Sequence, residues 1–297
     1  MPKLVLIDGS SYLYRAFHAL PPLTAADGTP TGALFGIVNM LKSSLKENAE
    51  YIGFVLDAPG PTFRDALYPE YKANRAAMPD DLRAQVEPMM AIVQALGLPV
   101  IRVPGVEADD VIGTFAVQAA KDGVDVVIST GDKDFAQLVG PHIKLTNTMT
   151  GSVSDEQRVL EKFGVRPDQI VDYLALMGDA VDNVKGVEKC GPKTAAKWLA
   201  EFETLDAVIA HADKITGKIG ENLRAALPIL PLNRTLVTIK TDVALDRDYT
   251  QLLQLPPHAE ELTALYSRFG FKQALKELQG ADIPAGSKPT ATHASAA

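Results

Sequence analysis

Short runs of β-branched and other apolar residues alternate with longer amphipathic stretches through the first half of this 297-residue chain. The runs predict strands at residues 4–7, 52–56, 100–103, 126–129 and 143–146. The stretches between them predict helices at residues 11–20, 32–46, 81–96 and 108–120. Such an alternation is typical of a parallel sheet covered by helices. The sequence therefore predicts an α/β fold with a doubly wound, mostly parallel sheet.

The strand pattern fades near residue 166, where short helical segments separated by Gly and Pro take over. We therefore expect a sheet-containing domain at residues 1–165 and a helical subdomain at residues 166–278. Residues 279–297 are small and polar, which predicts a flexible tail or linker. Residues 59–79 have no apolar period and predict a long excursion from the sheet.

Composition narrows the class of protein. Hydrophobic residues make up 46% of the chain, enough for a sizeable core, and the net charge is −8. The single cysteine, Cys190, excludes an internal disulfide, and five histidines without cysteine partners argue against a structural zinc site. No apolar run approaches the about 20 residues of a membrane span, and the N-terminus lacks a signal-peptide pattern. We expect a cytoplasmic protein.

Carboxylates follow three of the predicted strands directly and gather at two further places in the sequence. Because ligands of open α/β sheets bind beyond the carboxyl ends of the strands, we expect these acids to converge on one site. Each acid alone has an ordinary explanation as a turn residue or a helix cap. The acids of the expected site are Asp8, Asp57, Glu107, Asp109, Asp110, Asp132, Asp134, Asp179 and Asp182.

Such a cluster needs cations. At about 5 Å and an effective dielectric constant of about 20, each pair of like charges costs about 3 kcal/mol. Oxygen ligands without His or Cys favour Mg²⁺ or Mn²⁺ over zinc. Two such ions can activate a water and stabilise the leaving oxygen of a phosphodiester. The chain has neither a G-x-x-x-x-G-K-[ST] nor a G-x-G-x-x-G sequence, so a nucleotide cradle is not expected.

Basic residues predict where a polyanion docks. Residues 184–199, VKGVEKCGPKTAAKWL, contain four lysines against one glutamate, and Gly191 with Pro192 predicts a turn into a helix N-terminus. This segment is a candidate clamp for DNA phosphates, with a solvated lysine face as the alternative. The candidate DNA-binding residues of this segment are Lys189, Gly191, Lys193, Thr194 and Lys197.

The excursion carries Tyr71, Lys72 and Arg75 within one helical turn, which suits a single strand held by its phosphates and stacked on an aromatic ring. An exposed loop is the alternative. Arg15, which follows Asp8 along the chain, is placed to meet a phosphate or to form a surface salt bridge.

Six segments together carry a family resemblance. They are LIDGSSYLYRAFHALPPL, TFRDALYPEYKANR, MPDDLRAQ, GVEADDVIG, ISTGDKDFAQLV and LALMGDAVDN. In this order and spacing they resemble the 5′-nuclease domain of bacterial DNA polymerase I, a member of the flap endonuclease family, over residues 3–278. The resemblance implies a PIN-like nuclease domain, a helical arch at about residues 59–90 and a helix-hairpin-helix in the helical subdomain.

The resemblance also implies residue roles. The nine acids fall on the metal-binding positions of the family, Lys72, Arg75 and Arg15 on catalytic basic positions, and Arg64 and Tyr71 on DNA-binding positions. In one place the chain departs from the family pattern, because Lys189 stands where the hairpin has its first glycine and Lys185 where proline is common. A glycine there is free to adopt positive φ. The K⁺ ion that such hairpins hold is therefore an open expectation.

We expect a Mg²⁺-dependent 5′ to 3′ exonuclease and flap endonuclease that binds two Mg²⁺, with Mn²⁺ as a substitute. Its substrate is expected to be DNA with a 5′ flap, nick or 5′ end at a duplex, as in primer removal and repair, near the bacterial nucleoid. The chain is expected to be a monomer, joined through its tail to a polymerase portion. The alternatives are a non-catalytic junction-binding module and a PIN-type ribonuclease.

Overall fold

The computed structural model describes residues 2–280 of the protein, so residues 281–297 of the predicted tail lie outside it. Its centre is a six-stranded sheet with the order β3-β2-β1-β4-β5-β6. The first five strands are parallel to their neighbours, and β6 runs antiparallel to β5. The five predicted strands are confirmed. The strands are β1 Lys3–Asp8, β2 Tyr51–Val55, β3 Val100–Ile101, β4 Asp125–Ser129, β5 Ile143–Asn147 and β6 Ser152–Ser154.

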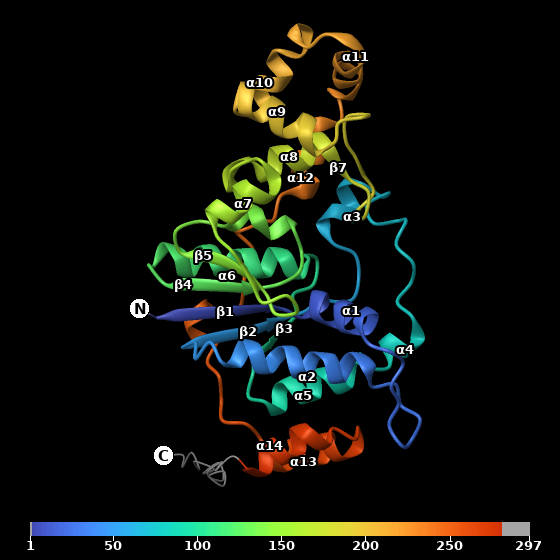
Figure 1. The fold of residues 1–297 in the computed structure, drawn as a ribbon, viewed down its shortest axis with the longest axis vertical. Helices are drawn as coiled ribbons and strands as arrows, with labels where there is room; N and C mark the ends of the chain where they lie inside the picture. Colours follow the sequence, from blue (N-terminus) through green and yellow to red (C-terminus); the bar gives the residue numbers. More distant parts are fainter. Residues whose placement is uncertain (1, 281–297) are drawn as a thin grey trace, which may run out of the picture.

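Alternate residues of β1 point into two separate cores, as the pleat of a strand requires. Val5 and Ile7 pack in one core with the helices of the lower layer in Figure 1. Leu4 and Leu6 pack in the other with α6 and the helical subdomain. The lower layer consists of α1 Gly9–Ala19, α2 Gly32–Leu45, α5 Val86–Ala95, α13 Ala259–Arg268 and α14 Lys272–Gly280, and the upper layer begins with α6 Ala108–Lys121.

The helix predicted at residues 81–96 is split into α4 (Asp80–Arg83) and α5. Pro88 lies in the first turn of α5, where its missing N–H removes no helical hydrogen bond. Gln85 at the break is buried, donates to the carbonyl oxygen of Asp81 at 2.8 Å and accepts from the N–H of Leu34 at 3.1 Å. The break therefore ties α5 to α2.

The expected arch segment, residues 59–90, leaves the sheet after β2 along the right edge of Figure 1. It contains α3 (Phe63–Leu67) and α4, and the chain between these short helices is made of turns and irregular structure. We call residues 59–90 the arch segment below.

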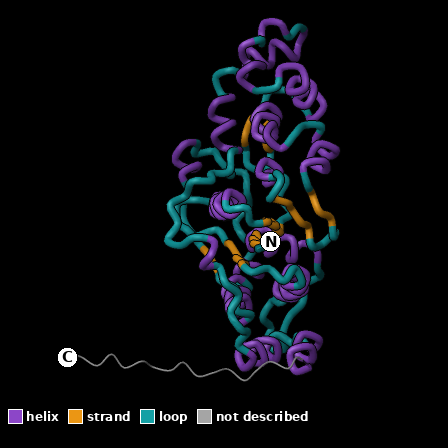
Figure 2. Tube along the Cα trace, turned by 90° about the vertical axis from the view of Figure 1, so that its left-hand side faces the viewer, coloured by secondary structure: helices purple, strands orange, loops and turns teal. Residues whose placement is uncertain are grey.

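Helices of the second half extend the molecule along its long axis, as Figures 1 and 2 show from two directions. The last two, α13 and α14, were expected in the helical subdomain at residues 166–278. They lie instead at the other end of the molecule, where Leu262 and Tyr266 share a core with α2 and α5. The elements above the sheet are α7 Glu156–Phe163, α8 Ile170–Met177, β7 Gly178–Asp179, β8 Val184–Lys185, α9 Pro192–Phe202, α10 Leu205–Ala210, α11 Gly217–Ala226 and α12 Leu230–Val237.

Four short 3₁₀ helices complete the element order of residues 2–280: η1 Asp134–Leu138, η2 Pro167–Gln169, η3 Ala212–Lys214 and η4 Tyr249–Gln251. Within residues 2–280, none of the helices combines the length and apolar character needed to cross a membrane.

Candidate active site

Asp8 is the last residue of β1 and stands at the carboxyl edge of the sheet. Its Oδ1 accepts the N–H of Ser11 at 2.9 Å, which caps α1, and its Oδ2 accepts the Thr130 hydroxyl at 2.7 Å. Asp57 follows β2, and its Oδ1 accepts the N–H of Ala108 at 2.9 Å. These bonds to helix starts fix both carboxylates at the edge, as expected for acids that follow parallel strands.

Several of these carboxylates lie close enough together to raise one another's pKa values, in addition to the effect of burial. Burial raises the pKa of Asp8 to about 7, and the charges of Asp132 and Asp57 add to the shift. Burial also raises the pKa of Asp109 well above its ordinary value, with Asp8, Asp132 and Glu107 as the next causes. A carboxyl pKa rises when neither solvent nor a cation stabilises the charged form. Burial and mutual repulsion therefore outweigh the charge of Lys72, which lowers the pKa of Asp109.

A second group lies around Asp134. Burial raises the pKa of Asp134 to about 8, and the charges of Asp132 and Asp179 raise it further. The Oδ1 of Asp134 is buried and has no hydrogen-bond partner among residues 2–280. Asp179 accepts the N–H of Val181 at 2.7 Å and forms an ion pair with Lys133 at 2.8 Å. Asp132 is common to both groups and joins them into one acidic cluster.

Basic residues of the arch segment pack onto the far side of this cluster. The Lys72 ammonium forms an ion pair with Glu107 and lies 3.7 Å from Asp182. The Arg75 guanidinium also pairs with Asp182. The hydroxyl of Tyr71, which is buried, lies 3.1 Å from Glu107 and 3.0 Å from Asp182. These contacts, together with the bond from the N–H of Lys72 to the carbonyl oxygen of Asp182 at 3.0 Å, dock the arch segment on the acids.

The donor set fits a divalent cation. In the described part of the chain, no three of these side chains stand in an arrangement that could hold a metal ion as they are. The acids that the arch segment and Lys133 neutralise are separate from those whose pKa values are raised, namely Asp8, Asp109 and Asp134. Oxygen donors that repel one another and include a buried oxygen without a partner match the preference of Mg²⁺ or Mn²⁺.

The hairpin segment, residues 184–199, presents free cations. Gly191 caps α9 and Pro192 is its first residue, as predicted. Lys189 adopts φ of 63°, so a non-glycine residue takes the left-handed conformation at this position. Three exposed lysines of this segment have no ion-pair partner within residues 2–280; these hairpin lysines are Lys189, Lys193 and Lys197.

Comparison with known proteins places this site in a family. Residues 3–164 match the family model described as 5′-3′ exonuclease, N-terminal resolvase-like domain, and residues 165–261 match 5′-3′ exonuclease, C-terminal SAM fold. The chain belongs to the 5′-3′ exonuclease family. The predicted family resemblance, the α/β fold class and the expectation of a nuclease are thereby confirmed.

Relatives of this 5′-3′ exonuclease family member include DNA polymerase I of Pseudomonas aeruginosa, 54% identical over 93% of this chain and 31% of the relative. The chain thus spans about a third of that protein. A 5′-3′ exonuclease of Aquifex aeolicus is 38% identical over 94% of this chain and 96% of the relative.

Solved structures share the fold. T5 5′-exonuclease, solved with divalent zinc ions bound, has a TM-score of 0.67 at 21% identity over 94% of this chain and 98% of that one. The catalytic core of Rad2 in complex with DNA substrate has a TM-score of 0.63 at 18% identity over 94% of this chain and 91% of that one. At these identities the likeness is one of fold alone.

Two expected site residues form a buried ion pair in this exonuclease. Arg64 is 2% exposed, and its guanidinium donates to both carboxylate oxygens of Asp110 at 2.7 and 2.8 Å. Its other donors reach the carbonyl oxygens of Leu236 and Thr238 and the carboxylate of Glu107. Four of the five N–H groups donate hydrogen bonds within the protein, and the expected contact of Arg64 with DNA stays a prediction.

Asp110 is held by protein donors on both oxygens, and its expected role as a metal ligand stays a prediction. Its oxygens also accept the N–H groups of Glu107 at 3.0 Å and Lys240 at 2.9 Å, and its side chain is fully buried. With both oxygens held by protein donors, Asp110 joins α6 to the arch segment and to the chain after α12. Its neighbour Asp109 is the one that faces the acidic cluster.

Arg15 reaches across to β5 and to the turn after β4. Its Nη2 donates to Oδ1 of Asn147 at 2.5 Å, and its guanidinium lies over Gly131, where an added Cβ would stand 2.7 Å from Nη1. Tyr71 is buried against the acids, so it does not offer the exposed ring that stacking on a base requires.

The sequence analysis missed two residues of the site. Thr130 holds Asp8, and Lys133 pairs with Asp179. Both lie in the segment TGDKD, in which only the acids were considered; Thr130 precedes these acids and Lys133 lies between them.

Proposed function

We propose that this member of the family is a Mg²⁺-dependent 5′ to 3′ exonuclease and flap endonuclease that hydrolyses DNA phosphodiesters at junctions of single and double strands. One observation carries the proposal: the carboxylates with raised pKa values form an oxygen-only cluster at the sheet edge, and arch cations lie on its flank. This combination suits an anionic substrate that brings a phosphate to metal ions.

The acidic cluster would hold two divalent ions, which activate water and stabilise the leaving oxygen of the phosphodiester when bound. One would be held by Asp8, Asp109 and Asp132, with Asp57 and Glu107 beside them. The other would be held by Asp134, Asp179 and Asp182. The pKa shifts support this grouping, because the charge of Asp8 raises the pKa of Asp109, whereas those of Asp179 and Asp182 raise the pKa of Asp134; Asp132 acts on all three groups.

The residues of the chain itself then act on the substrate. Lys72 and Arg75 neutralise Glu107 and Asp182, and with ions bound to these acids both cations would be available to the scissile phosphate. Two cations aimed at the phosphate stabilise the negative charge that grows on its oxygens during hydrolysis. Asp182 keeps its place because the N–H of Lys72 holds its carbonyl oxygen.

The hairpin lysines bind the duplex, since they are exposed and free to pair with phosphates. The DNA complex of Rad2 and the metal ions of T5 exonuclease, which share this fold, support a DNA substrate and a divalent cofactor. The relatives named DNA polymerase I support a role in primer removal and repair beside a polymerase portion. A K⁺ ion at the hairpin stays a prediction.

The test is cleavage of a 5′-labelled DNA flap by the full chain in Mg²⁺ and in EDTA, with a matched RNA flap and with Asp109→Asn. We expect Mg²⁺-dependent fragments cut near the junction of the DNA flap, and no product from Asp109→Asn. A DNA flap that binds but stays uncut with Mg²⁺ or Mn²⁺ would favour the non-catalytic junction-binding module. Preferential cutting of RNA would favour the ribonuclease.

A further inference from the structure

A small cavity adjoins the acidic cluster on the flank away from the arch segment. It has a volume of about 60 Å³ and is walled by the turn after β4, by β5 and β6, and by α7. The arch segment leaves the sheet after β2, whereas this cavity lies beyond β4, on the other side of β1. Asp132, a member of the acidic cluster, lines the cavity, so its contents would lie next to the reaction site.

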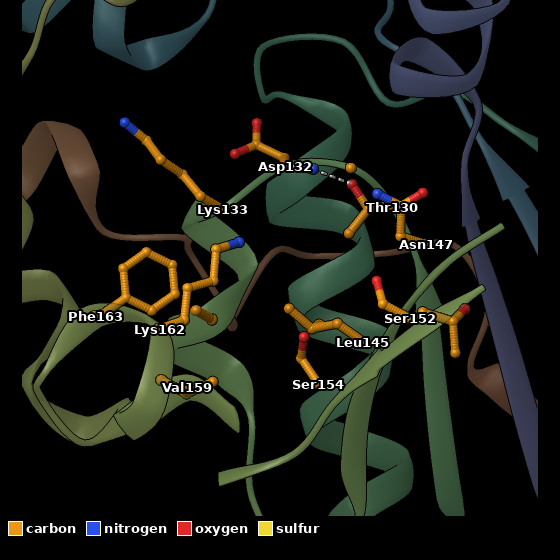
Figure 3. Close-up of a pocket in the computed structure, with 13 residues that line it drawn as sticks. Thr130, Asp132, Lys133, Leu145, Asn147, Ser152, Ser154, Val159, Lys162 and Phe163 are labelled. Atoms are coloured by element: carbon orange, nitrogen blue, oxygen red, sulfur yellow. Dashed lines mark hydrogen bonds between the residues drawn. The ribbon is translucent and has the colours of Figure 1, made fainter. Parts of the chain in front are cut away.

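Asn147 supplies an amide donor to this cavity. Its Oδ1 accepts from Arg15 at 2.5 Å and from the N–H groups of Met149 and Thr150 at 3.1 and 3.3 Å. Three donors on one oxygen fix the orientation of the amide. The nitrogen has no partner among the residues that the structure describes, and Figure 3 shows it on the side of Thr130. Asn147 therefore offers two free N–H groups.

Lys162 supplies a charge from the opposite wall. Figure 3 shows its ammonium turned from α7 toward the interior of the cavity, with Ser154 on the facing strand. Within residues 2–280 this ammonium has no carboxylate partner, and the Ser154 hydroxyl has no hydrogen bond. Lys162 contacts the ring of Phe163, with its nitrogen 5.0 Å from the ring centroid. The cavity thus has an unpaired cation and an unused hydroxyl.

The lining as a whole favours an anion. Lys162 contributes an unpaired positive charge, and Lys133, which also lines the cavity, pairs with Asp179 outside it. Behind Asn147, the Nη1 of Arg15 is buried without a partner in the described part of the chain. Cations, an amide and a hydroxyl around a space of about 60 Å³ match the oxygens of one tetrahedral phosphate group.

We propose that this cavity, bounded by Asn147, Ser154 and Lys162, binds a phosphate group. In the nuclease the group is a backbone phosphate of the bound DNA close to the scissile bond; a free phosphate or the 5′-phosphate of a released nucleotide has the same chemistry. The assignment to DNA rests on the proposed function. The scissile phosphate would then lie between the arch cations on one flank and this cavity on the other.

The first test compares Lys162→Ala with Lys144→Ala, which removes the same charge from an exposed lysine of β5 outside the cavity. Flap DNA binding to the full chain is measured by fluorescence anisotropy in EDTA over a series of salt concentrations. We expect Lys162→Ala to weaken binding about 5-fold to 10-fold and to reduce the salt slope by about one. Lys144→Ala should bind as the wild type does.

The second test identifies the source of the phosphate. Single neutral methylphosphonate linkages are moved along the flap substrate, and binding of dAMP and of inorganic phosphate is measured by calorimetry. One linkage that weakens binding to the wild type but not to Lys162→Ala assigns the cavity to DNA. Binding of dAMP or phosphate that Lys162→Ala abolishes, without such a linkage, assigns it to a free phosphate.

The proposal is overturned if both lysine variants bind DNA with equal affinity and equal salt slope and the wild type binds neither dAMP nor phosphate. Flap cleavage by the wild type is scored separately. If the wild type cuts DNA flaps but Lys162→Ala changes neither DNA binding nor phosphate binding, the cavity does not bind phosphate and the proposed function still stands.

Discussion

The arch segment and the hairpin segment both carry basic residues, but the two sets have opposite surroundings. Lys72 and Arg75 of the arch segment pair with carboxylates of the acidic cluster. The hairpin lysines are exposed and have no ion pair within residues 2–280. A free cation lends its full charge to a phosphate, whereas a paired cation must first exchange its partner. The arch cations should therefore act in chemistry and the hairpin lysines in affinity.

The largest expected effect is on stability, at the most deeply buried cation of the arch segment. Arg64→Met leaves the Asp110 carboxylate buried without its partner, which we expect to lower the free energy of unfolding by about 3–5 kcal/mol. Lys193→Met, which removes an exposed cation, should change it by less than about 0.5 kcal/mol. Urea denaturation in EDTA measures both. Equal stabilities would mean that the arch and hairpin cations do not differ as described.

Lys72→Ala should separate chemistry from binding. Because Lys72 faces the acidic cluster, we expect its loss to slow single-turnover cleavage of a saturating flap substrate about 100-fold. The dissociation constant in EDTA should change less than twofold. Lys193→Ala should show the reverse, with weaker binding and unchanged cleavage at saturation. Parallel losses of binding and cleavage in Lys72→Ala would make it a general phosphate contact.

The acidic cluster should show itself in the pH dependence of metal binding. Raised pKa values, about 7 for Asp8 and about 8 for Asp134, mean that the metal-free fold is most stable with these groups protonated and loses stability as pH rises from about 4 through 8. Ions require the deprotonated carboxylates. Thermal unfolding should therefore show a lower Tm in EDTA at pH 8.5 than at pH 6.0, and a larger rise on adding Mg²⁺.

NaCl at the same ionic strength as the added Mg²⁺ salt is the control for that measurement, and it should not reproduce the rise in Tm. A Mg²⁺-induced shift that is the same at both pH values would mean that Asp8 and Asp134 do not hold the ions.

The smallest expected effect concerns salt. Replacing Lys189 and Lys193 with alanine should reduce the slope of log Kd against log salt concentration for duplex DNA by about two, because each free lysine releases one counterion from the DNA. The matching double variant replaces Lys72 and Arg75 with alanine. Because these two cations are paired with carboxylates in the metal-free protein, their loss should leave the slope nearly unchanged in EDTA. Equal slopes for the two double variants would remove the distinction between paired and free cations.

Periodicity predicted the sheet well because parallel strands buried on both faces are nearly continuous apolar runs. The missed strand, β6, has the sequence Ser-Val-Ser and depends on its partner β5 for its conformation. The acids after β1, β2 and β4 were found because the topology itself brings the carboxyl ends of these strands to one edge.

The sequence could not show which of two adjacent acids faces the acidic cluster. Asp109 and Asp110 follow one another on α6, where successive side chains point about 100° apart. Only one of the two can face the cluster, and the position of a distant residue decides which. Arg64 reaches Asp110 because the chain after α12 supplies carbonyl oxygens at Leu236 and Thr238 that orient the guanidinium.

The sequence by itself determined the α/β layers, the acidic edge and the family of this protein, since local periodicity and strand-end residues are properties of neighbours in the chain. Only the tertiary structure decided which charged side chains pair with one another. The acid partner lies 35 positions away for Lys72 and 107 positions away for Arg75. Lys133 likewise pairs with the distant Asp179. Charge pairing depends on distance in space, and a sequence gives no such distance for residues so far apart.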